Sequence, residues 1–298
     1  MTTATIIAQG KTFTNYIGKD RFLGQYPGAV VAYSMRHIGS SYVGPLIRAR
    51  RSLDSKEQDF YAVDGWINVG ELKAFALNGD VFISIWYDQS GNGHHAIQPN
   101  QVAQPRIVKS GNIDVFGSRM CAFFDGIDDF MPLPEKICET FNSDESAFSV
   151  YTSFLYGDGN TVNIFSVSSK SNITPNSNNI LTLQALRKGK NIGLYSQNTA
   201  NIVNDAVSTT GLQNGRPVAA GFLRKDKEIT LIDGNITTQA WVDMGDVNYK
   251  LATVGGLRRG TNEELLASEI KIGELIIYNK SSSSLSDEIT SNIQTAFQ

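Results

Sequence analysis

The chain has 298 residues, a formal net charge of −3, an isoelectric point near 5.7 and only 18% charged residues. This mild acidity argues against a general nucleic-acid binder and against a protein that binds anionic membranes, and no apolar run approaches the roughly 18 residues of a membrane helix. The length suffices for a large core and is within the range of a single β-sandwich, so we expect one folded domain without nucleic-acid or membrane partners.

Residues 1–27 differ from the rest of the chain because no helical period and no clean strand period runs through them. We interpret this segment as an N-terminal arm that is too short to form its own core, and we place the main domain at residues 28–298. Two roles are open for the arm. It is either an anchor that pairs with a neighbouring protein or a terminal strand that caps the domain.

The first 30 residues also lack the apolar stretch of a secretory signal, because Lys11, Lys19 and Asp20 interrupt it. We therefore expect the protein to fold in a cytoplasm. In that compartment Cys121 and Cys138 are expected to remain reduced, as two small buried thiols.

The front of the chain alternates strand signals with one helix signal. Residues 29–36 form an apolar run that fits a short buried strand or a helical turn, and residues 46–50 alternate apolar and basic side chains like a half-buried strand. Residues 67–77 carry apolar side chains at helical spacing. Residues 81–87 are a strong strand signal, which ends in the polar turn Asp88–Gly93.

The rest of the chain consists of short strand signals separated by turns. Asp233-Gly234-Asn235 between two alternating runs predicts a hairpin. Leu285, Ile289, Ile293 and Phe297 form an i, i+4 stripe, which predicts a C-terminal helix lying on the domain. Short strands without intervening helices predict an all-β, antiparallel sandwich or barrel.

Three motifs narrow this fold by resemblance. The Trp86–Ala96 segment, the Asp125–Phe130 turn after a Phe-Phe strand and the Ile272–Tyr278 strand with its exit helix resemble concanavalin A-like (laminin-G-like) jelly-roll β-sandwiches. Trp86–Ala96 is similar to the arabinofuranosidase B catalytic domain. Together with Ala32–Arg36 and Tyr42–Ser52 it looks closer still to phage tail- and head-fibre proteins.

The resemblance to arabinofuranosidases also implies where catalytic residues would lie. Retaining glycosidases use two carboxyl groups, one as nucleophile and one as acid/base. The segment matching the family's nucleophile, residues 164–170, contains no carboxylate, and the position of the family's acid holds Leu257. These departures imply that the glycosidase chemistry is absent. Glu263 and Glu264, which follow Arg258 and Arg259, are expected to form a solvated face.

Three further groups are candidate ligands of a metal ion. Asp125, Asp128 and Asp129 cluster in one turn, and they fit either a Ca²⁺ site or plain turn chemistry, in which carboxylates accept local backbone N–H groups. No other cofactor is expected. His94 and His95 are adjacent and would point in different directions on a strand, which argues against a shared metal.

Candidate carbohydrate-binding residues are the aromatics Trp66, Tyr195 and Trp241 and the Asn-rich segment 172–179, because lectin-like sandwiches bind sugars through such side chains. Each of them is equally compatible with a core position or a solvated loop.

One hypothesis is favoured by three observations. They are the resemblance of the opening motifs to phage virion proteins, the lack of a secretory signal and the lack of the two carboxylates that arabinofuranosidases use. The hypothesis is a non-enzymatic structural protein of a phage virion, a tail or head appendage that is made in the host cytoplasm. As partners we expect other virion proteins, bound through the arm, further copies of the chain in a homo-oligomer, and a host-surface glycan. The alternatives are an arabinofuranosidase-like glycoside hydrolase with relocated carboxylates and a carbohydrate-binding surface adhesin.

Overall fold

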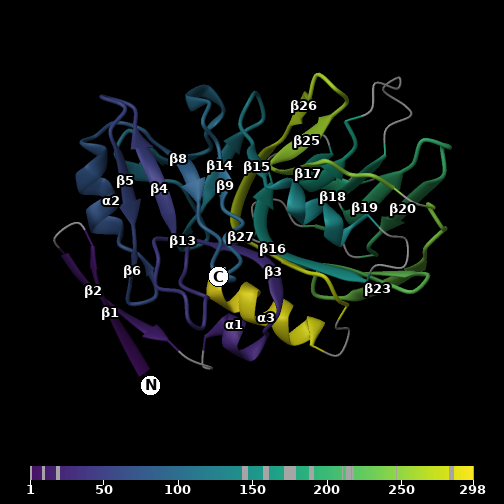
Figure 1. Cartoon of the computed structure of the whole chain (residues 1–298), viewed down its shortest axis with the longest axis horizontal. Coiled ribbons are helices and arrows are strands. Elements are labelled where there is room, and N and C mark those ends of the chain that lie inside the picture. The colour runs from purple at the N-terminus through teal and green to yellow at the C-terminus, as the bar shows by residue number, and fades with distance from the viewer. Residues whose placement is uncertain are drawn as a thin grey trace.

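A computed structural model gives the fold and describes residues 2–8, 11–17, 21–142, 147–156, 161–170, 179–187, 191–209, 211–212, 216, 218–245, 247–281 and 285–297. Every strand ladder among them is antiparallel. The larger sheet has thirteen strands (Figure 1). Ten of them form a continuous path in the order β23 (Ile236–Ala240), β22 (Glu228–Ile232), β21 (Val218–Lys225), β16 (Phe148–Tyr156), β27 (Glu269–Tyr278), β14 (Ala122–Asp125), β10 (Arg106–Lys109), β8 (Val81–Trp86), β4 (Ile47–Arg51) and β5 (Glu57–Phe60). The other three pair with strands of this path: β3 (Ala29–Ser34) with β27, β9 (Ala96–Ile97) with β8 and β11 (Asn112–Ile113) with β10.

The second sheet has six strands and covers one half of the first. Its order is β15 (Met131–Leu133), β24 (Leu251–Val254), β17 (Val162–Ser168), β18 (Ile180–Arg187), β19 (Asn191–Gln197) and β20 (Val203–Val207). Four two-stranded sheets complete the set: β1 (Thr2–Ala8) with β2 (Lys11–Ile17), β6 (Ala62–Val63) with β7 (Trp66–Ile67), β12 (Val115–Phe116) with β13 (Arg119–Met120), and β25 (Gly256–Arg259) with β26 (Glu264–Ala267).

The helices are short and lie outside the sheets. They are α1 (Phe22–Gln25), α2 (Val69–Ala76), α3 (Ser286–Phe297) and the 3₁₀ turns η1 (Gln101–Ala103) and η2 (Glu135–Thr140). The expected helix at residues 67–77 is α2, whose first turn is capped by the Asn68 side chain through the Glu71 N–H at 3.1 Å. None of the described helices has the length and apolar character needed to cross a membrane.

The main core lies between the two sheets. Alternate residues of β16 and β21 point into it, such as Val150, Phe154 and Phe222, and they meet Phe165 and Leu183 of the six-stranded sheet. This arrangement confirms the predicted all-β sandwich. Cys138 belongs to this core and Cys121 to a second one, and the two are free buried thiols.

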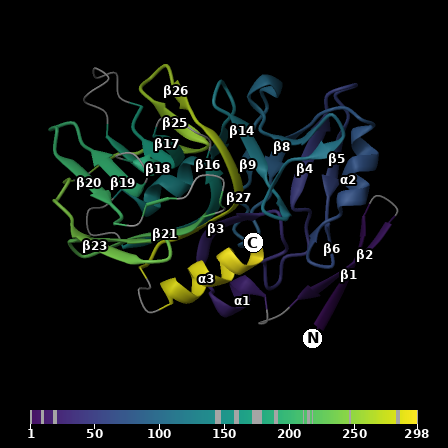
Figure 2. The same cartoon turned by 180° about the vertical axis from the view of Figure 1, so that it is seen from behind.

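The C-terminal helix α3 covers the outer face of the thirteen-stranded sheet, as the apolar stripe predicts (Figures 1 and 2). Ile289, Ile293 and Phe297 are buried against this sheet in the second core. The Gln294 side chain accepts a hydrogen bond from the Ala219 N–H of β21 at 2.8 Å. The helix therefore docks by both apolar burial and a specific polar contact.

The Trp86–Ala96 motif is a structural element that attaches a turn to β3. The buried Asp88 carboxylate accepts hydrogen bonds from the backbone N–H groups of Ala32, Ser90 and His94 at 2.9–3.0 Å. Gln89 donates to the backbone carbonyl oxygens of Ser34 and Arg36. The contacts to Ala32, Ser34 and Arg36 join residues more than fifty positions apart in the sequence, so the motif ties this turn to β3 and the residues that follow it.

The N-terminal segment forms more regular structure than its sequence indicates, since β1 and β2 pair along seven residues each. They share no strand ladder with the sandwich, and β3, from Ala29, is the first strand of the main sheet. The boundary between arm and domain at residue 27 remains a prediction.

Candidate functional site

The β25–β26 hairpin lies over the outer face of the six-stranded sheet, above β17 (Figure 1). The Ser166 hydroxyl donates to the Gly256 carbonyl at 2.8 Å, and the Ser168 hydroxyl donates to the Arg258 carbonyl. The two segments that the arabinofuranosidase resemblance matches to catalytic carboxyls therefore do lie side by side. Between them they present serines and backbone where that chemistry requires two carboxyl groups.

A carboxylate does reach this place from the hairpin turn. Glu263 accepts a hydrogen bond from the Lys170 ammonium and another from the Arg258 guanidinium, each at 2.8 Å. The backbone of Glu263 is left-handed, with φ at 51°, a conformation that non-glycine residues rarely adopt. The expected solvated face is thus correct for the exposed Glu264, whereas the half-exposed Glu263 is held in two ion pairs.

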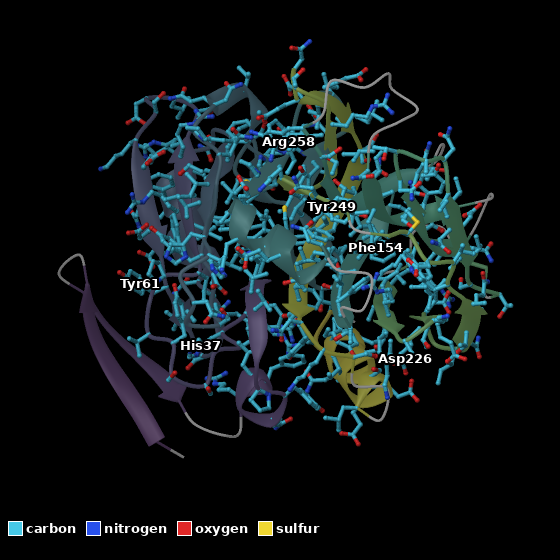
Figure 3. All side chains as sticks on the ribbon, turned by 45° about the vertical axis from the view of Figure 1, so that its right-hand side comes forward. His37, Tyr61, Phe154, Asp226, Tyr249 and Arg258 are labelled. Carbon is cyan, nitrogen blue, oxygen red and sulfur yellow. The ribbon has the colours of Figure 1, made fainter. Side chains whose placement is uncertain are left out.

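Arg258 anchors this ion cluster. Its side chain is buried near the top of the sandwich (Figure 3), donates to the Thr253 hydroxyl at 3.0 Å and lies 5.1 Å over the ring of Phe130. The two cations hold the pKa of Glu263 below its usual range, chiefly through the Lys170 contact. A general acid at neutral pH needs a raised pKa, so Glu263 is suited to an anionic, structural or ligand-positioning role.

Gly255 sets the path of the chain from β24 into this hairpin. Its φ is +78°, and an added Cβ would overlap the buried Phe124 ring. We expect Gly255→Ala to lower the free energy of unfolding by about 3 kcal/mol, because strain and overpacking add. Gly260→Ala, at φ +71° with open space around it, is the matched control and should cost about 1 kcal/mol. Equal losses in urea unfolding would contradict the packing argument.

A row of polar side chains crosses the outer face of the six-stranded sheet beside the hairpin. The strand register aligns one residue from each of five neighbouring strands, in the order Thr253, Ser166, Thr182, Tyr195 and Asp205. They face away from the core because the residues on either side of them in β17 and β18 point into it.

The inner part of this face is a network of buried polar side chains. The Asn163 side-chain oxygen accepts hydrogen bonds from the Thr182 hydroxyl at 2.9 Å and from the Gln184 amide at 3.0 Å. Gln184 is only 7% exposed, and its own oxygen Oε1 is buried and has no hydrogen-bond partner among the residues that the structure describes. A buried acceptor of this kind costs free energy unless a donor reaches it.

The outer part of the face, on β19 and β20, is half-exposed. The Tyr195 hydroxyl donates to the side-chain oxygen of Gln197 at 2.8 Å, and the Gln197 amide donates to Asn201 at 3.1 Å. Asp205 pairs with Tyr195 across the strands. We call the half-exposed residues Tyr195, Gln197 and Asp205, together with the exposed Asn201, the Tyr195 patch. It combines an aromatic ring with amide and carboxylate groups.

The Asp125–Phe130 turn brings its three carboxylates together. Oxygens of Asp125, Asp128 and Asp129 lie within 4.8 Å of one another, a donor set that suits a hard cation. The same oxygens also make turn contacts: Asp125 accepts from the Ile127 N–H at 2.8 Å, and Asp129 accepts from the Asp125 N–H at 3.0 Å. Burial and the neighbouring Asp125 charge raise the pKa of Asp129 to about 7.

This pKa has a consequence for stability. The folded Asp129 holds its proton up to about pH 7, whereas its ordinary pKa is 3.8, so the unfolding free energy should fall as the pH rises from about 4 to 7. We expect a decline on the order of 2 kcal/mol after solvent screening. Asp129→Asn should abolish it, and the Asp128→Asn control should retain most of it. Urea unfolding at several pH values measures both.

Adding Ca²⁺ to the same variants separates a calcium site from plain turn chemistry. With turn chemistry alone, millimolar Ca²⁺ should leave the melting temperature at pH 7.5 unchanged. A Ca²⁺-dependent rise that disappears in Asp129→Asn would establish a calcium site, since a bound cation would ionise Asp129 and stabilise the folded state.

The structure separates the three predicted sugar-binding aromatics. Tyr195 belongs to the patch described above. Trp241 is 6% exposed in the main core with the Arg224 guanidinium 5.2 Å from its ring, so the ring is not available for stacking on a sugar. Trp66 lies on the other side of the molecule, half-buried against Phe297. Of the Asn-rich segment 172–179, only Asn179 falls within the described residues.

The adjacent histidines His94 and His95 make backbone contacts that hold the Trp86–Ala96 motif in place. His94 contacts the Val30 carbonyl and His95 accepts from the Asp88 N–H, each at 3.1 Å. Their ring nitrogens thus contact the backbone of two different segments.

Comparison with known proteins identifies the fold. No family model matches the chain, and no curated protein matches it. Among solved structures, a GH54 α-L-arabinofuranosidase variant soaked with 4-nitrophenyl α-L-arabinofuranoside aligns with a TM-score of 0.65 at 15% identity, and an arabinofuranosidase complexed with arabinofuranosyl-α-1,2-xylobiose aligns with 0.62 at 15%. Each alignment covers 94% of this chain, which in turn spans about two thirds of those chains, 66% and 65%.

These alignments support a jelly-roll-like sandwich and overturn the functional hypothesis drawn from the sequence. The expectation of a phage virion structural protein is wrong, because 94% of the chain aligns with GH54 α-L-arabinofuranosidase structures. Of the motifs behind that expectation, Trp86–Ala96 makes structural contacts through Asp88 and Gln89.

Proposed function

We propose that this chain binds a neutral oligosaccharide on the outer face of its six-stranded sheet, between the β25–β26 hairpin and the Tyr195 patch. The observation that carries the proposal is the half-exposed Tyr195 patch, in which Tyr195 and Asp205 continue the polar register of the buried Thr253, Ser166 and Thr182 onto an accessible part of the face. The fold shared with arabinofuranosidases supports a carbohydrate as the ligand.

The chemistry of this face suits a sugar. Sugar hydroxyls both donate and accept, so they can donate to the half-exposed Asp205 carboxylate and accept from amides and hydroxyls. The Tyr195 ring offers an apolar surface for the C–H face of the sugar. The Lys170–Glu263–Arg258 cluster borders the same face, with the Glu263 carboxylate paired to both cations.

Glycoside hydrolysis is the second candidate, because one observation favours it. Asp129, with a pKa of about 7, has the proton affinity that a general acid requires, and Asp125 lies beside it. Binding without hydrolysis remains the better supported function, since Asp129 is 4% exposed and is held by a backbone N–H.

The two candidates are separated by assaying one purified sample for both properties. We expect arabinofuranosyl-α-1,2-xylobiose to bind in calorimetry, and we expect no release of nitrophenol from 4-nitrophenyl α-L-arabinofuranoside. Release that is lost in Asp129→Asn would establish the hydrolase instead. Absence of both binding and release would contradict both candidates for this class of sugar.

A further inference from the structure

A tight turn at residues 198–201 joins β19 to β20 at the end of the six-stranded sheet and contributes Asn201 to the Tyr195 patch (Figure 1). The Asn201 N–H closes the turn by donating to the Asn198 carbonyl at 3.1 Å. The Asn201 backbone is left-handed, with φ at 61°, a conformation in which asparagine is enriched. The patch therefore depends on a turn of defined geometry.

The Asn198 side chain holds this turn closed from inside. Its oxygen Oδ1 accepts hydrogen bonds from the Ala200 N–H at 3.0 Å and from the Ile202 N–H at 2.9 Å. Its amide nitrogen Nδ2 donates to the Met244 carbonyl at 2.7 Å. Asn198 is only 6% exposed, so it attaches the turn to the segment that follows β23 and does not itself face a ligand.

Two further hydrogen bonds connect the turn to the aromatic side chain of the patch. The Asn201 side chain accepts from the Gln197 amide at 3.1 Å, and Gln197 accepts from the Tyr195 hydroxyl at 2.8 Å. Without such bonds, half-exposed side chains of this length would sample several rotamers. The orientation of the Tyr195 hydroxyl thus depends on Asn198, a buried residue outside the patch.

We propose that Asn198 is a positioning residue for the oligosaccharide face. It holds the turn, and through Asn201 and Gln197 it fixes the Tyr195 hydroxyl before a sugar arrives. A side chain that is already ordered in the free protein loses less conformational entropy on binding, so the affinity is higher than for a mobile patch. This inference rests on the proposed function, because it assigns Asn198 a role in binding the same oligosaccharide.

Asn204 in β20 is the matched control for Asn198. It is 5% exposed, and its side chain also makes buried backbone contacts: it donates to the Val242 carbonyl at 2.9 Å and accepts from the Val242 N–H at 2.7 Å. These contacts attach β20 to the segment after β23 and do not involve the turn. We therefore expect Asn204→Ala to lower the melting temperature as Asn198→Ala does, without releasing the Tyr195 hydroxyl.

The first test follows the Tyr195 Cζ signal in the NMR spectrum of the full chain, labelled with ¹³C-tyrosine and free of sugar. Tyr195→Phe identifies the signal by removing it, and Gln197→Ala shows its position when the hydroxyl has lost this partner. We expect Asn198→Ala and Asn201→Gly to move the signal toward that position, and Asn204→Ala to leave it in place. Glycine adopts a left-handed backbone readily, so Asn201→Gly removes the side-chain bond without straining the turn. An unmoved signal in Asn198→Ala, or equal movement in Asn204→Ala, would overturn the proposal.

The second test measures binding of arabinofuranosyl-α-1,2-xylobiose to the same variants by calorimetry, at temperatures where each is folded. We expect Asn198→Ala to weaken binding about three- to tenfold, the loss typical of one hydrogen bond, and Asn204→Ala to stay within about twofold of the unaltered chain. Unchanged affinity in Asn198→Ala despite a moved Tyr195 signal would overturn this inference and leave the proposed function standing. Failure of the unaltered chain to bind would instead contradict the proposed function, on which the inference rests.

Discussion

Replacing Glu274 by alanine should lower the free energy of unfolding by about 3–5 kcal/mol, the largest stability effect we expect from a single substitution in this chain. Glu274 is completely buried in β27, where its carboxylate accepts hydrogen bonds from the Ser34 hydroxyl at 2.5 Å and from Arg36. Arg36 also donates to Asn292 of α3 at 3.1 Å. Removing the acid leaves the guanidinium uncompensated at the junction of β3, β27 and α3.

The control for this substitution lies in the same strand. Glu269 is exposed, so Glu269→Gln should change stability by less than about 0.5 kcal/mol. The double variant Glu274→Leu with Arg36→Met removes both charges and should recover part of the loss, because the cost arises from the unpaired ion. Urea unfolding measures all three. A loss in Glu274→Ala no larger than in Glu269→Gln would show that the buried pair does not hold these elements together.

Tyr195→Ala should weaken binding of arabinofuranosyl-α-1,2-xylobiose by about 10- to 100-fold, the largest effect on function that we expect. The substitution removes both the ring and the hydroxyl that holds Gln197 in place, and aromatic anchors of this kind dominate the binding energy of small sites. Tyr195→Phe keeps the ring and should lose only a part of the affinity. Calorimetry on samples of equal melting temperature gives the comparison.

The matched control is another half-buried tyrosine. Tyr61 follows β5 in the other half of the molecule, as Figure 3 shows, and Tyr61→Ala should leave the affinity unchanged. If Tyr195→Ala binds the oligosaccharide as tightly as the unaltered chain does, the Tyr195 patch is not the binding surface.

Much of the fold follows from local sequence patterns. The strong strand signal of residues 81–87, the hairpin turn at Asp233 and the apolar stripe of α3 are each contained in a few neighbouring residues. The pairing of β1 with β2 was missed because its strands lack a clean alternation.

The candidate site depends on contacts that no local pattern encodes. The ion cluster forms because the β25–β26 hairpin folds over β17 and brings Arg258 and Glu263 to Lys170. Glu263 contacts the two cations through a left-handed backbone conformation, which no local sequence pattern predicts. The polar row is formed by register between five strands. The available sequence signal for this polar face was the alternation in β18, where the polar Thr182 and Gln184 are separated by apolar residues. Such alternation is typical of a strand with one apolar and one polar face.

Burial decided between the aromatic candidates in the same way. Trp241 and Tyr195 are similar as sequence features, and only the packing of the sheets places the first in the core and the second on an accessible face. A large aromatic residue in a strand is compatible with both positions.

The central claim is that an oligosaccharide lies on the outer face of the six-stranded sheet and remains intact there. The most direct test is an amide chemical-shift map of the isotope-labelled chain, titrated with arabinofuranosyl-α-1,2-xylobiose, with the sugar signals followed in the same sample. We expect shifts confined to β18, β19, β20 and the β25–β26 hairpin, with unchanged sugar signals. Shifts centred on the Asp125–Phe130 turn together with the appearance of free arabinose would contradict the claim.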